Sequence, residues 1–436
     1  MKEPRTWRRD MARIGGESLL VGSGHVVGAV GSIVSVKVLT TYLSPEQYGQ
    51  FSLGLTAAVL TGQILSGPLS AATTRFFAPS TESLRLEPFI TATFDLLAHF
   101  AGIVLTIATL CGLVWLLHPS IIVATLAVAL LLSLITGAEQ ILDSIQNAAR
   151  HRGLVAWHLG LGPWLRFACA VALFKVAGTT TVSAICGYLF GASVLLLSQY
   201  GFFRWKIGKP RLTRADRADA RDLEKRMLRY AWPFGIWGIF TSVQLASDRW
   251  ALGIFQDLHS VGVYNVAYQL GYYPVLLAST ALMQVASPIL FATAGDASEV
   301  SRVRRTRSAA LRLSLISVIL TTLGFIVLLN LDRDLFGAVV GPGFRGATIY
   351  LPYLFLAGGV FAAGQFAIHV PLIEFDTKGA LFTKITTALI GTALNFVGAA
   401  VWGVKGVVGA TLAFSFLYLV AMLRLSRTRS NGQQTR

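Results

Sequence analysis

Charged residues are scarce in this sequence, and acidic ones are the scarcest. Asp and Glu supply 21 of 436 residues and Lys and Arg supply 37, so charged residues make up 13% of the chain and hydrophobic residues 54%. The mean hydropathy is +0.62. This composition leaves almost no sequence for a soluble domain and predicts a chain that lies mostly within a membrane.

Cysteines are few and recognisable catalytic motifs are absent. The three cysteines, Cys111, Cys169 and Cys186, lie within apolar stretches, which favours packing over a disulfide or a metal site. The sequence contains no nucleotide-binding loop, metal-ligand cluster or nucleophile constellation. It also lacks the long outward loop that membrane enzymes of glycan assembly usually carry. We therefore expect no enzymatic activity, no metal and no cofactor.

Twelve apolar stretches remain, and each is about long enough to cross a hydrocarbon core, which requires about 20 residues. We predict an all-α polytopic membrane protein with about twelve transmembrane helices in two six-helix lobes around a central cavity. The predicted spans are 17–42, 50–73, 90–117, 120–148, 154–176, 180–203, 230–255, 262–294, 309–331, 346–370, 380–402 and 405–424.

Positive charges between the spans alternate from one side to the other. Loops on the side of the N-terminus hold 29 of the 37 Lys and Arg, the opposite loops hold four, and four lie within spans. Because cytoplasmic loops carry the excess of Lys and Arg, both termini are predicted to be cytoplasmic. The net charge of +16 then indicates contact with anionic lipid headgroups at the inner face. No nucleic-acid-binding motif accompanies it, and no cleaved signal peptide is recognisable.

The longest polar stretch, 204–229, divides the twelve spans into two sets of six. The predicted parts are a cytoplasmic segment (1–16), an N-lobe (17–203), a basic linker (204–229), a C-lobe (230–424) and a cytoplasmic tail (425–436). Tyr48-Gly49 after span 1 and Val261-Gly262 after span 7 are 213 residues apart, close to half the chain. The offset indicates parallel repeats, and repeat-built transporters place their substrate path at the repeat interface.

Polar residues within spans are costly, so each is a candidate site residue. Span 1 carries His25, Gly28, Ser32 and Ser35 on one face, and span 7 carries a matching stripe. The members of that second stripe are Thr241, Gln244 and Asp248. Two interpretations stay open: the stripes line a hydrophilic cavity between the halves, or they pack helices closely through small residues. The cavity is favoured because an Asp packs poorly.

Arg166 lies near the middle of span 5, three residues after Pro163. Its planar fork suits phosphate, and the alternative is a buried pair with a carboxylate such as Asp95. Asp248 and Arg249 are neighbours in span 7 and point about 100° apart, so they need not pair. Glu139 is the deepest member of a span 4 stripe otherwise expected to be a solvated helix end.

Span 8 presents two tyrosines, Tyr268 and Tyr272, on one helical face together with Asn265. Tyrosines beside a cavity suit stacking on sugar rings. Aromatic belts at the membrane interface and ordinary packing are commoner explanations of the same pattern.

Several stretches, taken in order, resemble the polysaccharide-transport flippases, the Wzx-like O-antigen branch of the multidrug/oligosaccharidyl-lipid/polysaccharide exporter superfamily. The stretch from Lys37 to Phe51 is similar to that family's Leu-Ser-Pro-Glu-x-Tyr-Gly turn after its first helix, and Arg75 closes span 2. Further matches are 143–150, 230–233, 248–249, 261–264 and 409–410, so the resemblance covers essentially the whole chain.

The resemblance implies a MATE-like fold and transport of an oligosaccharide on undecaprenyl pyrophosphate across a bacterial inner membrane, by alternating access. Arg166, Arg249 and Arg75 are then candidates to hold the pyrophosphate, and Asp248 or Glu139 to bind H+ or Na+ as coupling ion. Expected partners are the lipid-linked glycan and possible complexes with a glycan polymerase and glycosyltransferases. The alternatives are a MATE-like ion-coupled multidrug exporter, a membrane enzyme of glycan assembly, and a non-transporting component of a glycan assembly complex.

Overall fold

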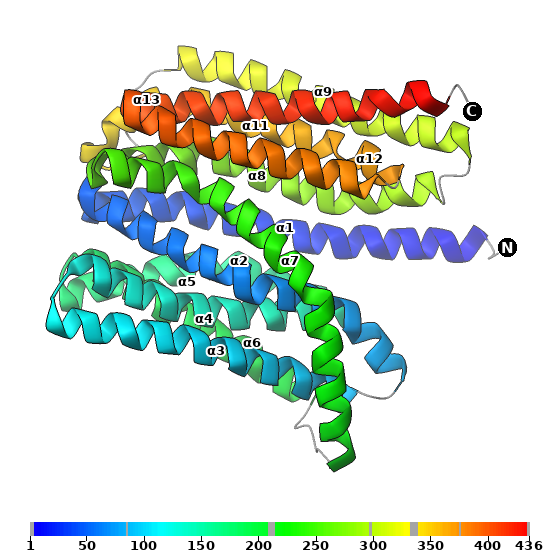
Figure 1. The fold of residues 1–436 in the computed structure, drawn as a ribbon, viewed down its shortest axis with the longest axis horizontal. Coiled ribbons are helices and arrows are strands. Elements are labelled where there is room, and N and C mark those ends of the chain that lie inside the picture. Colours follow the sequence, from blue (N-terminus) through cyan, green and yellow to red (C-terminus); the bar gives the residue numbers. More distant parts are fainter. Residues whose placement is uncertain are drawn as a thin grey trace. The chain divides into compact units, whose positions relative to one another are not determined.

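The computed structural model describes residues 4–83, 86–207, 214–295, 299–331, 339–374 and 376–433. These residues form helices joined by short connections, with no strand among them (Figure 1). The helices are α1 (Pro4–Tyr42), α2 (Pro45–Glu82), α3 (Leu86–Leu117), α4 (Ile121–Ala148), α5 (Arg152–Ala177), α6 (Thr181–Ile207), α7 (Arg214–Phe255), α8 (Leu258–Ala294), α9 (Val300–Asn330), the 3₁₀ helix η1 (Pro342–Ile349), α11 (Leu351–Ala367), α12 (His369–Ile373) and α13 (Thr377–Gln433).

Nine helical segments in this described part are long and apolar enough to cross a membrane. α7 and α8 add two long helices, and α13 consists of two arms that meet at Gly403. The φ of Gly403 is 59°, a conformation that strains any residue with a Cβ, so glycine permits the chain to turn back there. The described residues are almost entirely helical, which confirms the predicted all-α membrane fold.

One compact unit comprises residues 1–35 and 50–243. Within it α3 packs against α4, α4 against α6, and α5 against α6 (Figure 1). α1 approaches α5 closely because Gly28 lacks a side chain: a Cβ there would lie under 3.0 Å from the Leu159 carbonyl oxygen. The face of α1 that carries Gly28 is therefore partly a packing face.

The second half of the predicted linker is helical and continuous with span 7. Ala220, Leu223 and Met227 recur every three or four residues in α7 and are buried in the core of this first unit, in a cluster that includes Phe89. This spacing places apolar residues on one helical face and leaves the charged residues on the other. The amphipathic pattern explains why so charged a stretch still folds against the bundle. The predicted lobe boundaries themselves stay a prediction.

The second unit comprises residues 36–49 and 244–436. α11 lies at its centre, buried along most of its length against α8, α9 and α13. The end of α1 belongs to this unit as well, where Gly341 donates its backbone N–H to Thr40 Oγ1 at 3.0 Å. Lys37 donates from Nζ to the Val340 carbonyl at 3.0 Å, which satisfies a cation placed within an apolar stretch.

Candidate functional site

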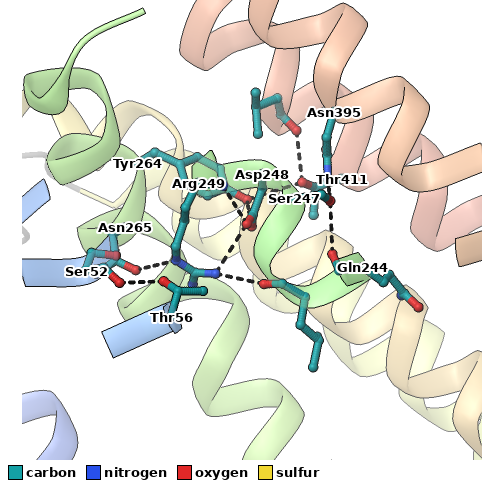
Figure 2. Close-up of polar contacts among 12 residues, drawn as sticks. Ser52, Thr56, Gln244, Ser247, Asp248, Arg249, Tyr264, Asn265, Asn395 and Thr411 are labelled. Atoms are coloured by element: carbon teal, nitrogen blue, oxygen red, sulfur yellow. Dashed lines mark hydrogen bonds and ion pairs between the residues drawn. The ribbon is translucent and has the colours of Figure 1, made fainter. Parts of the chain in front are cut away.

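Asp248 and Arg249 are buried in the second unit, with 4% and 7% of their surfaces exposed. They do contact each other: Asp248 Oδ1 accepts bonds from the Arg249 backbone N–H at 2.7 Å and from Nη1 at 3.3 Å (Figure 2). Tyr264 donates its hydroxyl to Asp248 Oδ2 at 2.7 Å. The sequence left open whether these neighbours pair, and the structure pairs them because the long Arg249 side chain folds back onto Asp248.

Arg249 makes two further hydrogen bonds nearby. Nε donates to Asn265 Oδ1 at 2.8 Å, and Nη1 donates to the Leu245 carbonyl at 3.0 Å. The guanidinium carbon lies 4.1 Å from the centre of the Tyr268 ring, which is a cation–π contact. In this conformation Arg249 is a satisfied buried cation, and a pyrophosphate would have to displace these partners to reach it.

A water-sized cavity of about 20 Å³ adjoins Asp248, and polar side chains from several helices line it. Asn395 donates from Nδ2 to Ser247 Oγ at 2.9 Å, while its buried Oδ1 has no hydrogen-bond partner among the described residues (Figure 2). Thr411 also lines the cavity, and its hydroxyl lies 3.3 Å from that of Tyr264. A carboxylate, an unpartnered amide oxygen and a hydroxyl are oxygen donors suited to a water or a small hard cation.

The sequence analysis did not single out Asn395 or Thr411. Both are polar residues within apolar spans, and the cost of burying them was the available signal. Gln244, predicted to line a cavity between the halves, borders this small cavity within the second unit, and the predicted role stays a prediction. The Thr241 side chain lies outside the part of the chain that the structure describes.

Tyr268 and Tyr272 form a stacked pair with ring centres 4.8 Å apart and planes 18° apart. They are 7% and 3% exposed, and Tyr272 continues the aromatic contacts to Phe361 at 6.2 Å. Both rings are thus buried within the second unit in this conformation. Contact with a sugar would require a conformation that exposes them.

A second polar cluster lies in the first unit, where α5 brings Arg166 against Glu139 of α4 as an ion pair. The partner is Glu139 and not Asp95, which is exposed. One turn along α4, Asp143 accepts a bond from Gln199 Nε2 at 2.9 Å. The stripe expected to be a solvated helix end is therefore largely buried, because α5 and α6 cover it.

This first-unit cluster is incompletely satisfied. Among the described residues no partner exists for Glu139 Oε1, Arg166 Nε or Gln199 Oε1, all of which are buried. The Arg166 side chain nevertheless keeps 27% of its surface exposed, against 9% for Glu139. Arg166 therefore combines a buried donor that has no partner among the described residues with a partly exposed side chain, whereas Arg249 is buried and bonded.

The other predicted site residues lie at the edges of these clusters or away from them. Arg75 is exposed on α2, and His25 is half-buried on α1. Ser32 donates to the Gly28 carbonyl of its own helix at 2.9 Å. Ser35, on the same face, lies 3.0 Å from the Tyr188 hydroxyl. In the α1 stripe, Gly28 therefore serves close helix packing, whereas His25 is a partly accessible polar group.

The starts of α2 and α8 are capped helix ends. Ser44 and Gln47 form a capping box. The Gln47 N–H donates to Ser44 Oγ at 3.3 Å, and the Ser44 N–H donates to Gln47 Oε1 at 3.0 Å. Asp257 caps α8 by accepting the Ser260 N–H at 2.7 Å, a bond that lowers the pKa of the Asp257 carboxyl. Both caps fix the direction in which the following helix leaves.

Residues 213 positions apart meet where these two helices begin, and we call this contact the glycine clasp (residues 45–49 and 258–262). A Cβ on Gly49 would lie under 3.0 Å from the Leu258 carbonyl oxygen, and one on Gly262 under 3.0 Å from the Pro45 carbonyl oxygen. His259 Nδ1 lies 2.8 Å from Glu46 Oε1. The contact is reciprocal at the offset that the sequence repeat predicts.

Among the described residues, long apolar helices and buried charged clusters are typical of a polytopic membrane protein. The fold is that of the MOP superfamily of transporters and flippases. An inward-facing multidrug resistance MATE transporter of that superfamily aligns with a TM-score of 0.72 and 15% identity, over 94% of this chain and 96% of that one. The lipid II flippase MurJ, in an inward closed conformation, aligns with a TM-score of 0.65 and 15% identity, over 94% and 87%.

A third solved structure is a MOP superfamily transporter from Pyrococcus furiosus described as having a binding pocket of reversed polarity. It aligns with a TM-score of 0.60 and 15% identity, over 94% of each chain. The chain belongs to the polysaccharide biosynthesis protein family, whose profile matches residues 17–294, well over half of its length. No curated protein matches the sequence.

Proposed function

We propose that this protein is a flippase that moves an oligosaccharide linked to undecaprenyl pyrophosphate across the bacterial inner membrane, for assembly of O-antigen, capsule or exopolysaccharide. Membership of the polysaccharide biosynthesis family supports this role. The structural observation that carries it is Arg166, a cation deep in an apolar helix with a buried, unpartnered Nε and a partly exposed side chain. Both termini face the cytoplasm in this proposal, from the distribution of Lys and Arg.

Arg166 holds the pyrophosphate first, since its fork of donors fits phosphate oxygens. Arg249 and Arg75 contribute as the conformation changes, and Tyr268 and Tyr272 contact the sugars when they become exposed. His25, Ser32, Thr241 and Gln244 line the path. These roles are proposals that follow from residue chemistry and burial.

Asp248 binds the coupling ion, H+ or Na+, together with Asn395 and Thr411. The unpartnered Asn395 Oδ1 beside the water-sized cavity supports this assignment. Glu139 is the second candidate, because Arg166 leaves it when the pyrophosphate binds. A carboxylate without its cation in a buried site gains a proton more readily.

The glycine clasp supports alternating access. Residues 36–49, which are the end of α1 and the start of α2, come from the first half of the sequence, yet they pack with residues of the second half. At this contact the Glu46–His259 pair is exposed, whereas Tyr48 and Val261 are buried. We propose that the clasp closes the outer side and opens when substrate is released.

The alternative is a MATE-like ion-coupled multidrug exporter, and the fold of the solved relatives favours it as much as a flippase. A path for cationic drugs should be rich in acidic residues, whereas the partly accessible charge here is Arg166. Reconstituted protein tests the two. A flippase scrambles a fluorescent lipid-linked oligosaccharide across a vesicle and leaves an ethidium gradient unchanged, and an exporter does the reverse.

A further inference from the structure

The first four turns of α9 carry five arginines whose environments differ. Arg302 pairs with Glu299 at 3.3 Å, and Arg307 donates to the Ser426 carbonyl at 2.7 Å. Arg304, Arg305 and Arg312 are exposed and form no ion pair with any residue that the structure describes. Three arginines of one helix thus have no ion-pair partner among the residues that the structure describes.

These three arginines border one groove of about 680 Å³ along the helix. Arg305 and Arg312 are seven residues apart, about two helical turns, and so share a face, and Arg304 lies at its edge. Ser301 and Ser308 lie on the same face and add two hydroxyl donors. Arg304 and Arg312 are eight residues apart, about 12 Å along the axis, so they can contact two separate anionic groups at once.

The same helical face continues as an exposed apolar stripe. Ile316, Leu320, Leu323 and Val327 follow Arg312 at intervals of three or four residues and are 50–62% exposed. In a membrane such a stripe faces acyl chains, because α9 is one of the apolar helices long enough to cross it. The arginines are therefore at the depth of the headgroups of the lipids that cover the stripe.

We propose that the Arg304–Arg305–Arg312 face of α9 is a binding site for an acidic phospholipid whose two phosphates are joined through glycerol, the cardiolipin class. Guanidinium groups bind phosphate oxygens bidentately, and the hydroxyls of Ser301 and Ser308 add donors. A glycerol bridge holds two phosphates farther apart than the single shared oxygen of a pyrophosphate does. Two separate phosphates therefore match two arginines two turns apart on the helix better than a pyrophosphate does. The site does not depend on the proposed transport function.

The test is native mass spectrometry of the full-length protein, released from nanodiscs that contain phosphatidylethanolamine with either cardiolipin or phosphatidylglycerol. The variant R304Q/R305Q/R312Q removes the site. The matched control R217Q/R221Q/R226Q removes three exposed cations from the polar part of α7. We expect the amount of cardiolipin bound to the site variant to be at least fivefold lower than the amount bound to the wild type. The control variant should bind as much cardiolipin as the wild type.

Equal loss in both triple variants would overturn the proposal, because it would indicate only general attraction of a basic surface. Equal retention of phosphatidylglycerol and cardiolipin by the wild type would overturn the requirement for two phosphates. Displacement of cardiolipin by undecaprenyl pyrophosphate at equal concentration would assign the groove to the carrier lipid instead. If the glutamine variant does not reach the membrane, R304K/R305K/R312K retains the charge without the fork and should bind cardiolipin at an intermediate level.

Discussion

Arg166→Ala should reduce both transport and the amount of folded protein, for two separable reasons. The substitution leaves Glu139 buried without its cation, and breaking a buried ion pair costs about 3–5 kcal/mol. Because 27% of the Arg166 side chain is exposed, solvent screening lowers the expected cost to about 2–3 kcal/mol. That is a large part of the 5–15 kcal/mol stability typical of a folded protein.

The double variant E139Q/R166A separates the two reasons. Removing both charges of a buried pair is far less costly than removing one, so its membrane abundance and Tm should return to near wild-type values. Asp143 keeps its bond from Gln199 in both variants. If Arg166 binds the pyrophosphate, surface glycan display stays abolished in the double variant. R166K, which retains charge but not the bidentate fork, should retain part of the display.

The measurements are glycan display and membrane protein level, taken from the same cells that depend on this protein for their surface polysaccharide. Normal display from E139Q/R166A at normal abundance would refute the binding role and leave Arg166 as half of a structural pair. Low abundance of the double variant would refute the stability argument, because that variant has no buried unpaired carboxylate at position 139 that could explain the loss of folded protein.

Three further predictions follow from other parts of the chain. Gly262→Ala forces the clasp apart and should lower the Tm by several degrees, whereas Gly112→Ala, where a Cβ meets nothing within 4 Å, should leave it unchanged or slightly raised. An unchanged Tm for the former would contradict the close packing. Asn395→Leu removes the unpartnered oxygen and should abolish the dependence of transport on the coupling ion while the protein stays folded; retained dependence would exclude the site. Reporters fused at Asn431 and near Gly341 should give cytoplasmic and external signals, and signals from the same side would contradict the span count.

The all-α membrane fold could be predicted because each crossing needs a long apolar stretch, and the sequence contains twelve such stretches. The 213-residue repeat identified Gly49 and Gly262 as equivalent positions, but their contact with each other was not predicted. Arg166 could be singled out by its depth alone. These inferences depend on local composition and periodicity, which a sequence displays directly.

Side-chain partners could not be predicted in the same way. Arg166 and Glu139 are 27 residues apart on different helices, and their meeting depends on how α4 and α5 are rotated about their axes. Thr411 approaches Tyr264 from 147 residues away through α13, whose two arms turn at Gly403. The folding back of Arg249 onto Asp248 depends on rotamers that helical spacing leaves open.

The most direct test of the proposed function is flipping in reconstituted vesicles, with a fluorescent oligosaccharide carried on undecaprenyl pyrophosphate or on undecaprenyl monophosphate. The account predicts rapid flipping of the pyrophosphate-linked lipid by the wild type, slower flipping of the monophosphate-linked lipid, and slow flipping of both by E139Q/R166A. Equal rates for the two carriers in the wild type, or an unchanged rate in the double variant, would contradict pyrophosphate recognition by Arg166.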